Sequence, residues 1–222
     1  MSAIAIDPAV EPAVVVGPAP APGASATPAS APVSADRLYR MSLDQYHRLA
    51  EAGILGDARV ELIEGVLVAK MSKGQPHIIA LALLIEALRA VPAGWFLAVQ
   101  DPITLEGSAS EPEPDAKVIR GRPRDYAGRR IGPADTTLIV EIADSSLRDD
   151  QGVKKAIYAQ AAVPAYWIVN LAANRLEVYT DPTGVDPSPD YRRRADLAPG
   201  DEVPLVVDGR EVARIAVADL LP

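Results

Sequence analysis

The chain contains no cysteine and only two histidines, His47 and His77. Without thiols it can form neither disulfides nor thiolate metal sites, and two histidines are too few for an ordinary histidine-built zinc site. Any bound metal is therefore expected to be a hard cation that is held by oxygen atoms.

The chain also lacks a long apolar run. The longest, from Ile78 to Ile85, falls far below the roughly 18 to 20 residues that span a bilayer. A secretory signal would need basic residues before an apolar stretch, but Asp7 and Glu11 stand near the start instead. We expect a cytoplasmic protein with no membrane partner.

Residues 1–35 lack lysine and arginine, and they contain 11 Ala and 7 Pro without any helical or strand period. This composition is typical of a disordered or polyproline-like tail. The whole chain has 222 residues and 49% apolar content, which suffices for one substantial core. We therefore predict a tail over residues 1–35 and one folded domain over residues 36–222.

Basic residues are outnumbered, with 22 Lys and Arg against 30 Asp and Glu and a net charge of -8. This balance argues against a protein that coats nucleic acid through its overall charge. Basic residues do cluster between Lys117 and Arg130 and again from Arg192 to Arg194. The simpler interpretation is a solvated loop and an exposed strand edge, and a local phosphate track is the alternative.

Hydrophobic periodicity predicts an α/β fold. Ser42, with Gln45 three residues later, predicts a helix that ends at Gly53, and Pro76 begins a second, strongly apolar helix. A hairpin is predicted over residues 59–69, with its turn at 64–65. Further elements are strands at 95–99, 103–105, 113–119, 137–142, 165–169, 175–180, 191–195, 203–207 and 212–216, a helix at 150–162, and a closing helical turn at 217–221. The order predicts a mixed β-sheet flanked by helices, with additional C-terminal strands.

Two carboxylates in this pattern require an explanation. Residues 137–142 are apolar on both alternating faces, as in a strand buried inside a covered sheet, and Glu141 interrupts them. Asp115 stands in a similar position one strand earlier. A buried carboxylate is unfavourable unless it is paired or binds a metal, so both residues are candidate site residues.

The order and spacing of several segments are specific in combination: Pro114-Asp115, Val140-Glu141-Ile142, Lys154 with Tyr158, and residues 163–169 (Val-Pro-Ala-Tyr-Trp-Ile-Val). Glu61 to Gly65 in the hairpin and His77 at the following helix add to the pattern. Together they resemble the Uma2 family, also called DUF820, of restriction-endonuclease-like proteins in the PD-(D/E)XK nuclease superfamily. The similarity covers about residues 38–220.

This resemblance implies a metal-dependent endonuclease whose substrate is DNA. By position, Asp115 and Glu141 would bind Mg²⁺ or Mn²⁺. The superfamily usually places a lysine two residues after the second acid, where this chain has Ala143, and the family pattern points to Lys154 on the next helix instead. Glu61 enters as a possible third acid.

Metal-assisted hydrolysis explains these residue types. Cleavage of a phosphodiester needs an activated water, neutralisation of developing charge and help for the leaving oxygen, and a carboxylate-held divalent ion can serve all three needs. Mg²⁺ usually takes only one or two protein carboxylates, so Asp115 and Glu141 suffice. Lys154 would orient the water or neutralise the scissile phosphate.

Each candidate also has a structural interpretation. Asp115 could be a turn residue at a strand entry, Glu141 could form a salt bridge with Lys154, and Glu61 could be an exposed hairpin residue. His77 is more simply a helix-start or core histidine than a general base. Lys117 shares the strand phase of Asp115 and competes with Lys154 for the lysine role.

The overall alternative is an inactive nuclease fold that binds nucleic acid or a protein. Ala165 and Asn170 stand where relatives usually carry acids, and Asp144 replaces a small apolar residue. A homodimer remains possible under either interpretation, and the DNA sequence recognised is open.

Overall fold

The computed structural model describes residues 37–222, so the predicted tail lies outside the described residues. Residues 38–222 form one compact unit. The helices and strands are α1 (Leu43–Glu51), β1 (Val60–Ile63), β2 (Val66–Ala69), α2 (Gln75–Ala87), β3 (Trp95–Val99), β4 (Ala116–Arg120), β5 (Thr136–Ala143), α3 (Leu147–Asp149), α4 (Lys155–Gln160), β6 (Ala165–Asn170), β7 (Arg175–Pro182), β8 (Tyr191–Leu197), β9 (Glu202–Val207) and β10 (Arg210–Ala216).

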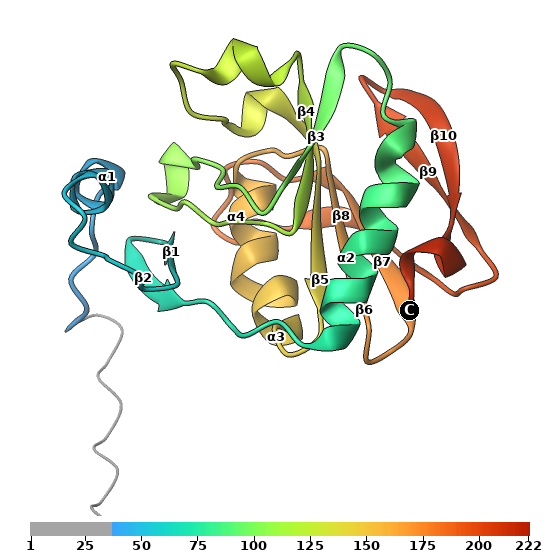
Figure 1. Ribbon diagram of the computed structural model, residues 1–222, viewed down its shortest axis with the longest axis horizontal. Helices are drawn as coiled ribbons and strands as arrows, with labels where there is room; N and C mark the ends of the chain where they lie inside the picture. The colour runs from blue at the N-terminus through green and yellow to red at the C-terminus, as the bar shows by residue number, and fades with distance from the viewer. Residues whose placement is uncertain (1–36) are drawn as a thin grey trace, which may run out of the picture. The chain divides into compact units, whose positions relative to one another are not determined.

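Six strands form the central sheet in the order β3-β4-β5-β6-β7-β8. Only β5 and β6 run parallel, and α3 and α4 lie in the connection between them. Every residue of β5 is buried, as its apolar run predicts for a central strand. The expected mixed sheet flanked by helices is therefore confirmed (Figure 1).

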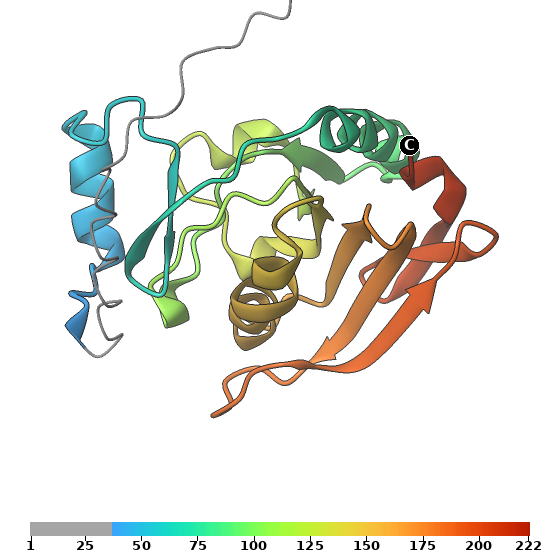
Figure 2. The same cartoon turned by 90° about the horizontal axis from the view of Figure 1, so that it is seen from below.

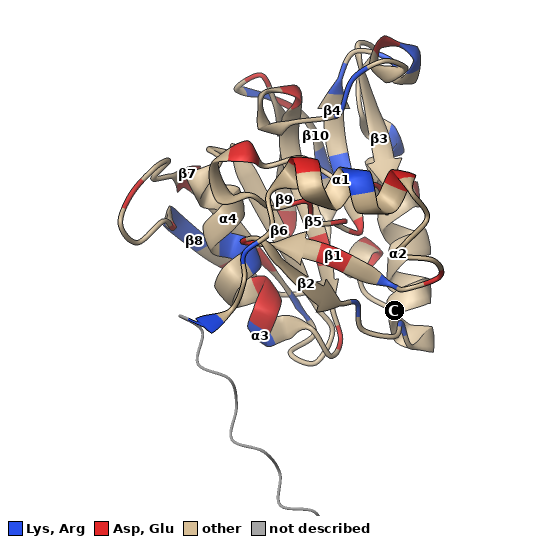
Figure 3. Ribbon diagram, turned by 90° about the vertical axis from the view of Figure 1, so that its left-hand side faces the viewer, with Lys and Arg blue, Asp and Glu red and all other residues tan. Residues whose placement is uncertain are grey.

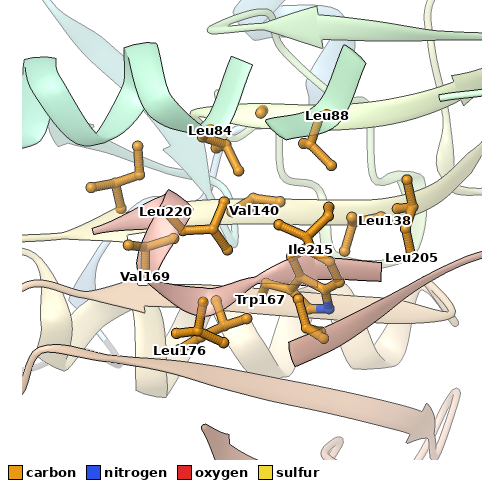
Figure 4. Close-up of a cluster of buried hydrophobic side chains, with 14 of the residues drawn as sticks. Leu84, Leu88, Leu138, Val140, Trp167, Val169, Leu176, Leu205, Ile215 and Leu220 are labelled. Carbon is orange, nitrogen blue, oxygen red and sulfur yellow. The ribbon is translucent and has the colours of Figure 1, made fainter. Parts of the chain in front are cut away.

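The two faces of the sheet carry separate cores. On one face, α2 and the β9–β10 hairpin pack on alternate residues of β5 and β6, including Val140 and Trp167 (Figure 4). On the other face, α4 packs on Ile139, Tyr166 and Ile168 (Figure 2). Glu141 follows the phase of Ile139, so β5 directs its carboxylate toward the face that α4 covers.

A small hairpin, β1–β2, stands apart from the central sheet. Its turn is formed by Glu64 and Gly65, both with positive φ, as the sequence predicts. A Cβ on Gly65 would lie 2.9 Å from the Met41 carbonyl oxygen, which favours glycine there. One bridge, from Leu62 to Glu111, joins the hairpin to the segment that leads into β4.

The first two predicted helices are confirmed. At α1, the Ser42 hydroxyl accepts from the Gln45 amide at 3.2 Å, and the Gln45 side chain accepts from the Ser42 amide at 3.0 Å. This reciprocal pair is the capping box that the sequence predicts. Within residues 37–222, no helix combines the length and apolarity needed to cross a bilayer.

Two local predictions are wrong. Residues 103–105 do not form a strand, because the chain turns back at once and Leu105 makes only an isolated bridge to Ser110. The single helix predicted over residues 150–162 is interrupted, since Asp150–Lys154 form a widened segment between α3 and α4 in which two helical stretches meet at a kink. Gly152 lies outside helical geometry there, at φ -104° and ψ -108°, and permits the kink.

Candidate active site

A cavity of about 80 Å³ opens where β1, the segment before β4, β5 and the widened helical segment approach one another. The loop between β2 and α2 also borders it. Its charged and polar lining residues are Glu61, Lys70, Ser72, Lys73, His77, Glu113, Asp115, Glu141, Asp144, Ser145, Ser146, Asp149 and Lys154. The structure therefore brings Glu61, Asp115, Glu141 and Lys154, which come from four separate segments, to the same cavity.

The Lys154 ammonium lies among three carboxylates. Its Nζ is 3.1 Å from Glu141 Oε1, 3.5 Å from Glu61 Oε1 and 3.7 Å from Asp150 Oδ1. All four side chains are at least nearly nine-tenths buried, with Lys154 the most exposed at 11%. The salt bridge between Glu141 and Lys154, which the sequence suggested as a structural interpretation of Glu141, is present.

Burial and crowding perturb this cluster. Burial is the main cause that raises the pKa of Glu141, and neighbouring carboxylates add to it while Lys154 opposes it. Burial likewise raises the pKa of Asp150 to about 6. Burial alone would lower the pKa of Lys154, but Glu141, Glu61 and Asp150 raise it above its ordinary value. Three carboxylates that share one ammonium favour the uptake of further positive charge, either as a proton or as a cation.

Glu141 is held by more than its ion pair. The Tyr158 hydroxyl donates to Glu141 Oε1 at 3.0 Å, and Tyr158 is itself fully buried on α4. Glu61 is fixed from the other side, because its Oε2 accepts from the Glu113 amide at 3.2 Å. The second and third acids are thus oriented by neutral donors as well as by Lys154.

Asp115 has its own set of partners, next to Glu141. Its Oδ2 accepts from the Ile142 amide at 2.9 Å, while Oδ1 lies 3.0 Å from His77 Nε2 and 2.9 Å from Lys73 Nζ. Burial alone would raise the pKa of Asp115, but His77, Lys73 and the Ile142 amide together hold it at about 2. Asp115 is therefore an ionised carboxylate with a fixed orientation.

His77 is buried at the start of α2 and orients Asp115. Its Nδ1 lies 3.1 Å from the Ile142 carbonyl oxygen, and its Nε2 faces the Asp115 carboxylate. This arrangement matches a buried helix-start histidine.

Lys117 shares the strand phase of Asp115 but is not among the residues that line the cavity. It is fully buried, and its Nζ donates to the Asp101 carbonyl oxygen at 2.7 Å. Burial lowers its pKa to about 8. Of the two candidate lysines, Lys154 is the one that contacts the acids.

The basic clusters are largely neutralised by neighbouring acids. Arg129 forms a two-point contact with Asp135, and Arg120 pairs with Asp208. On β8, Arg192 pairs with Asp181 and Arg194 with Asp196. Lysines, arginines and acids are also intermixed over the elements seen in Figure 3. The buried charged residues that line the cavity therefore indicate a functional site more specifically than these exposed basic clusters do.

The donor set fits a hard divalent cation. Within residues 37–222, no three acidic or histidine side chains are already spaced to hold one ion, because ammonium groups lie between the carboxylates. The available donors are nevertheless carboxylate oxygens, and Asp150 Oδ1 is buried without a hydrogen-bond partner. Oxygen donors with uncompensated negative charge suit Mg²⁺ or Mn²⁺ rather than a thiophilic metal.

Among the charged side chains that pair with the candidate residues, sequence reasoning missed Lys73, which pairs with Asp115, and Asp150, which pairs with Lys154. Lys73 lies in the loop before α2, and no local pattern distinguishes it from other surface lysines. Asp150 carries a readable signal, because it precedes Lys154 by four residues and so shares its helical face.

The sequence of residues 43–217 matches the Uma2 family, which is described as "Putative restriction endonuclease". No curated protein matches the chain. A crystal structure described as a "putative nuclease belonging to DUF820", from Anabaena variabilis, shares the fold with a TM-score of 0.62 and 17% identity, over 81% of this chain and 97% of that one. The chain therefore belongs to the Uma2 family and has the fold of its nuclease-like members.

Proposed function

We propose that this chain is an endonuclease that hydrolyses phosphodiester bonds in DNA with Mg²⁺ or Mn²⁺. The observation that carries the proposal is the convergence of Glu61, Asp115, Glu141 and Lys154 on one cavity. Membership of a family described as restriction endonucleases supports nucleic acid as the substrate.

Asp115 and Glu141 would hold the ion, with Glu61 as a third acid close by. The bound ion supplies positive charge that activates a water and neutralises phosphate oxygens. Two carboxylates suit Mg²⁺, which keeps several positions for water and phosphate. The Ile142 amide and the Tyr158 hydroxyl orient the two carboxylates before substrate arrives, which reduces reorganisation.

Lys154 would act on the substrate. In the structure its ammonium satisfies three carboxylates, the nearest at 3.1 Å. When those carboxylates engage a cation, Lys154 is free to turn toward the scissile phosphate and donate to an oxygen on which charge develops. Charge stabilisation of this kind accelerates a reaction because it is strongest in the transition state.

One observation favours a second candidate, a nuclease fold that binds nucleic acid or protein without cutting it. Lys154, Lys73 and Lys70 already pair with Glu141, Asp115 and Glu113 respectively. A cluster neutralised in this way is stable without metal and could persist after catalysis is lost.

A cleavage assay separates the two candidates. Supercoiled and linear DNA would be incubated with the protein and Mg²⁺ or Mn²⁺, with chelator controls. We expect cleavage by the parent, none by Asp115→Ala, and parental activity in Asp144→Ala, an exposed acid that borders the same cavity. A parent that binds DNA but leaves it intact with every metal would establish the non-catalytic candidate.

A further inference from the structure

Asp150 is the least expected acid of the site. It is only 1% exposed, and it lies at the start of the widened helical segment. Its Oδ2 accepts from the Ser146 hydroxyl at 2.6 Å. Its Oδ1 is the one buried carboxylate oxygen among residues 37–222 that has no hydrogen-bond partner. Such an atom is unfavourable in a folded protein unless something else uses it.

The surrounding structure fixes Asp150 in this unfavourable position. The Tyr166 hydroxyl donates to the Asp150 carbonyl oxygen at 3.0 Å. The next residue, Gln151, donates to both carboxylate oxygens of buried Glu177 at 2.9 and 2.8 Å. The kink at Gly152 follows, and Lys154 lies beside Asp150. Hydrogen bonds at Asp150 and Gln151 therefore hold the chain in place immediately before the kink.

A purely structural ion pair does not explain the geometry well. The Lys154 ammonium lies 3.7 Å from Asp150 Oδ1, beyond hydrogen-bond distance, whereas it lies 3.1 Å from Glu141. Lys154 already has a closer partner in Glu141. Asp150 Oδ1 therefore faces the Lys154 ammonium without accepting a hydrogen bond.

We propose that Asp150 is a ligand of the divalent cation and that the Lys154 ammonium marks the ion's position. The ammonium is surrounded by oxygens of Glu61, Glu141 and Asp150, which come from β1, β5 and the widened segment. Asp150 is not among the residues that line the cavity, whereas Lys154, which it contacts, is. A cation that takes the place of the ammonium contacts Asp150 Oδ1, and Lys154 moves toward the substrate. This inference rests on the proposed metal dependence. Of the acids proposed above, Glu141 and Glu61 surround this position, whereas Asp115 contacts Lys73 and His77 beside it.

Mn²⁺ binding measured by titration calorimetry tests the assignment directly, without reference to DNA cleavage. Asp150→Asn keeps the shape of the side chain and should weaken Mn²⁺ binding by at least about tenfold. Asp219→Asn is the control, because that aspartate is exposed and does not line the cavity, so the variant should bind Mn²⁺ as the parent does. Parental Mn²⁺ affinity in Asp150→Asn overturns the inference.

Thermal unfolding in chelator distinguishes a ligand from a structural partner. If Asp150 is a ligand, Asp150→Asn should melt at or above the parental temperature without metal and should lose most of the stabilisation by Mn²⁺. If Asp150→Asn melts at a lower temperature than the parent and is stabilised by Mn²⁺ as much as the parent is, Asp150 has a structural role and is not a ligand. If Asp150→Asn does not fold, Asp150→Glu serves instead. It keeps the charge but displaces the oxygen, so unchanged affinity in that variant also refutes ligation.

The outcomes separate this inference from the proposed function. A parent that binds Mn²⁺ through Asp150 but cuts no DNA refutes the nuclease function alone. A parent that cuts DNA, with Mn²⁺ affinity unchanged in Asp150→Asn, refutes the inference alone. A parent that binds no divalent ion refutes both.

Discussion

Replacing Lys154 by methionine tests the site most directly. The change keeps the length of the side chain and removes a charge that contacts three buried carboxylates, the closest at 3.1 Å. If the ammonium stabilises charge that develops only in the transition state, the cleavage rate should fall by roughly 10²-fold or more, a loss of about 3 kcal/mol. Metal affinity should change much less.

The same substitution should lower stability when no metal is present. Removing one partner of a buried ion pair typically costs about 3–5 kcal/mol, because the remaining charge is left unpaired. In chelator, Lys154→Met should therefore melt several degrees below the parent, and Mn²⁺ should restore part of the difference. Rates must be measured well below that melting temperature.

Two further lysines provide the comparison. Lys155 is the neighbouring residue and pairs with Asp190 at 2.8 Å, so Lys155→Met should have little effect on cleavage. Lys117 is fully buried outside the cavity and donates to the Asp101 carbonyl oxygen, so Lys117→Met should lower stability by leaving that oxygen without its donor, and it should not remove catalysis. Single-turnover rates at saturating metal compare the three variants. Full activity in Lys154→Met, with none in Lys117→Met, would refute the assignment in favour of the strand lysine.

Four other predictions concern metal binding and stability. Glu141→Gln should abolish Mn²⁺ binding in titration calorimetry, and parental affinity would contradict the ligand assignment. The pKa of Asp115 is about 2 in the folded protein and about 4 in the unfolded chain, so its ionised form stabilises the fold above pH 4. This stabilisation is lost as the pH falls toward 2. Asp115→Asn should therefore reduce the dependence of unfolding free energy on pH in this acidic range. Leu84→Ala, at a fully buried position of α2, should lower the free energy of unfolding by about 2–5 kcal/mol in denaturant titrations. Asp208→Ala, which removes the exposed ion pair with Arg120, should leave it almost unchanged. Removing residues 1–35 should leave the melting temperature nearly unchanged, and a drop of several degrees would show that they pack on the domain.

The order of elements was predictable because local signals and burial agree along most of the chain. The apolar run of β5 and the capping box at Ser42 each depend on nearby residues alone, and the sequence predicts both correctly. Residues 103–105 were misassigned because an apolar triplet does not reveal where its backbone partners lie. Leu105 pairs with Ser110 in its own loop instead of a sheet neighbour.

The site was only partly predictable. The four candidate residues do reach one cavity, but the contacts between them depend on side-chain packing that no spacing rule gives. The ion pair between Lys73 and Asp115 is one example, since these residues are 42 positions apart in the sequence. The spacing of Asp150 and Lys154 was readable from the sequence, but the kink at Gly152 between them was not.

The lysines within the acidic cluster have a consequence for how the protein is made. Carboxylates without a counter-ion would repel one another until a metal bound. Folding would then depend on metal supply, as it does in small zinc domains. Here Lys154 and Lys73 act as internal counter-ions for Glu141 and Asp115. The chain should therefore complete its fold in a metal-poor environment. If the proposed metal dependence holds, a chelator should stop DNA cleavage without unfolding the protein.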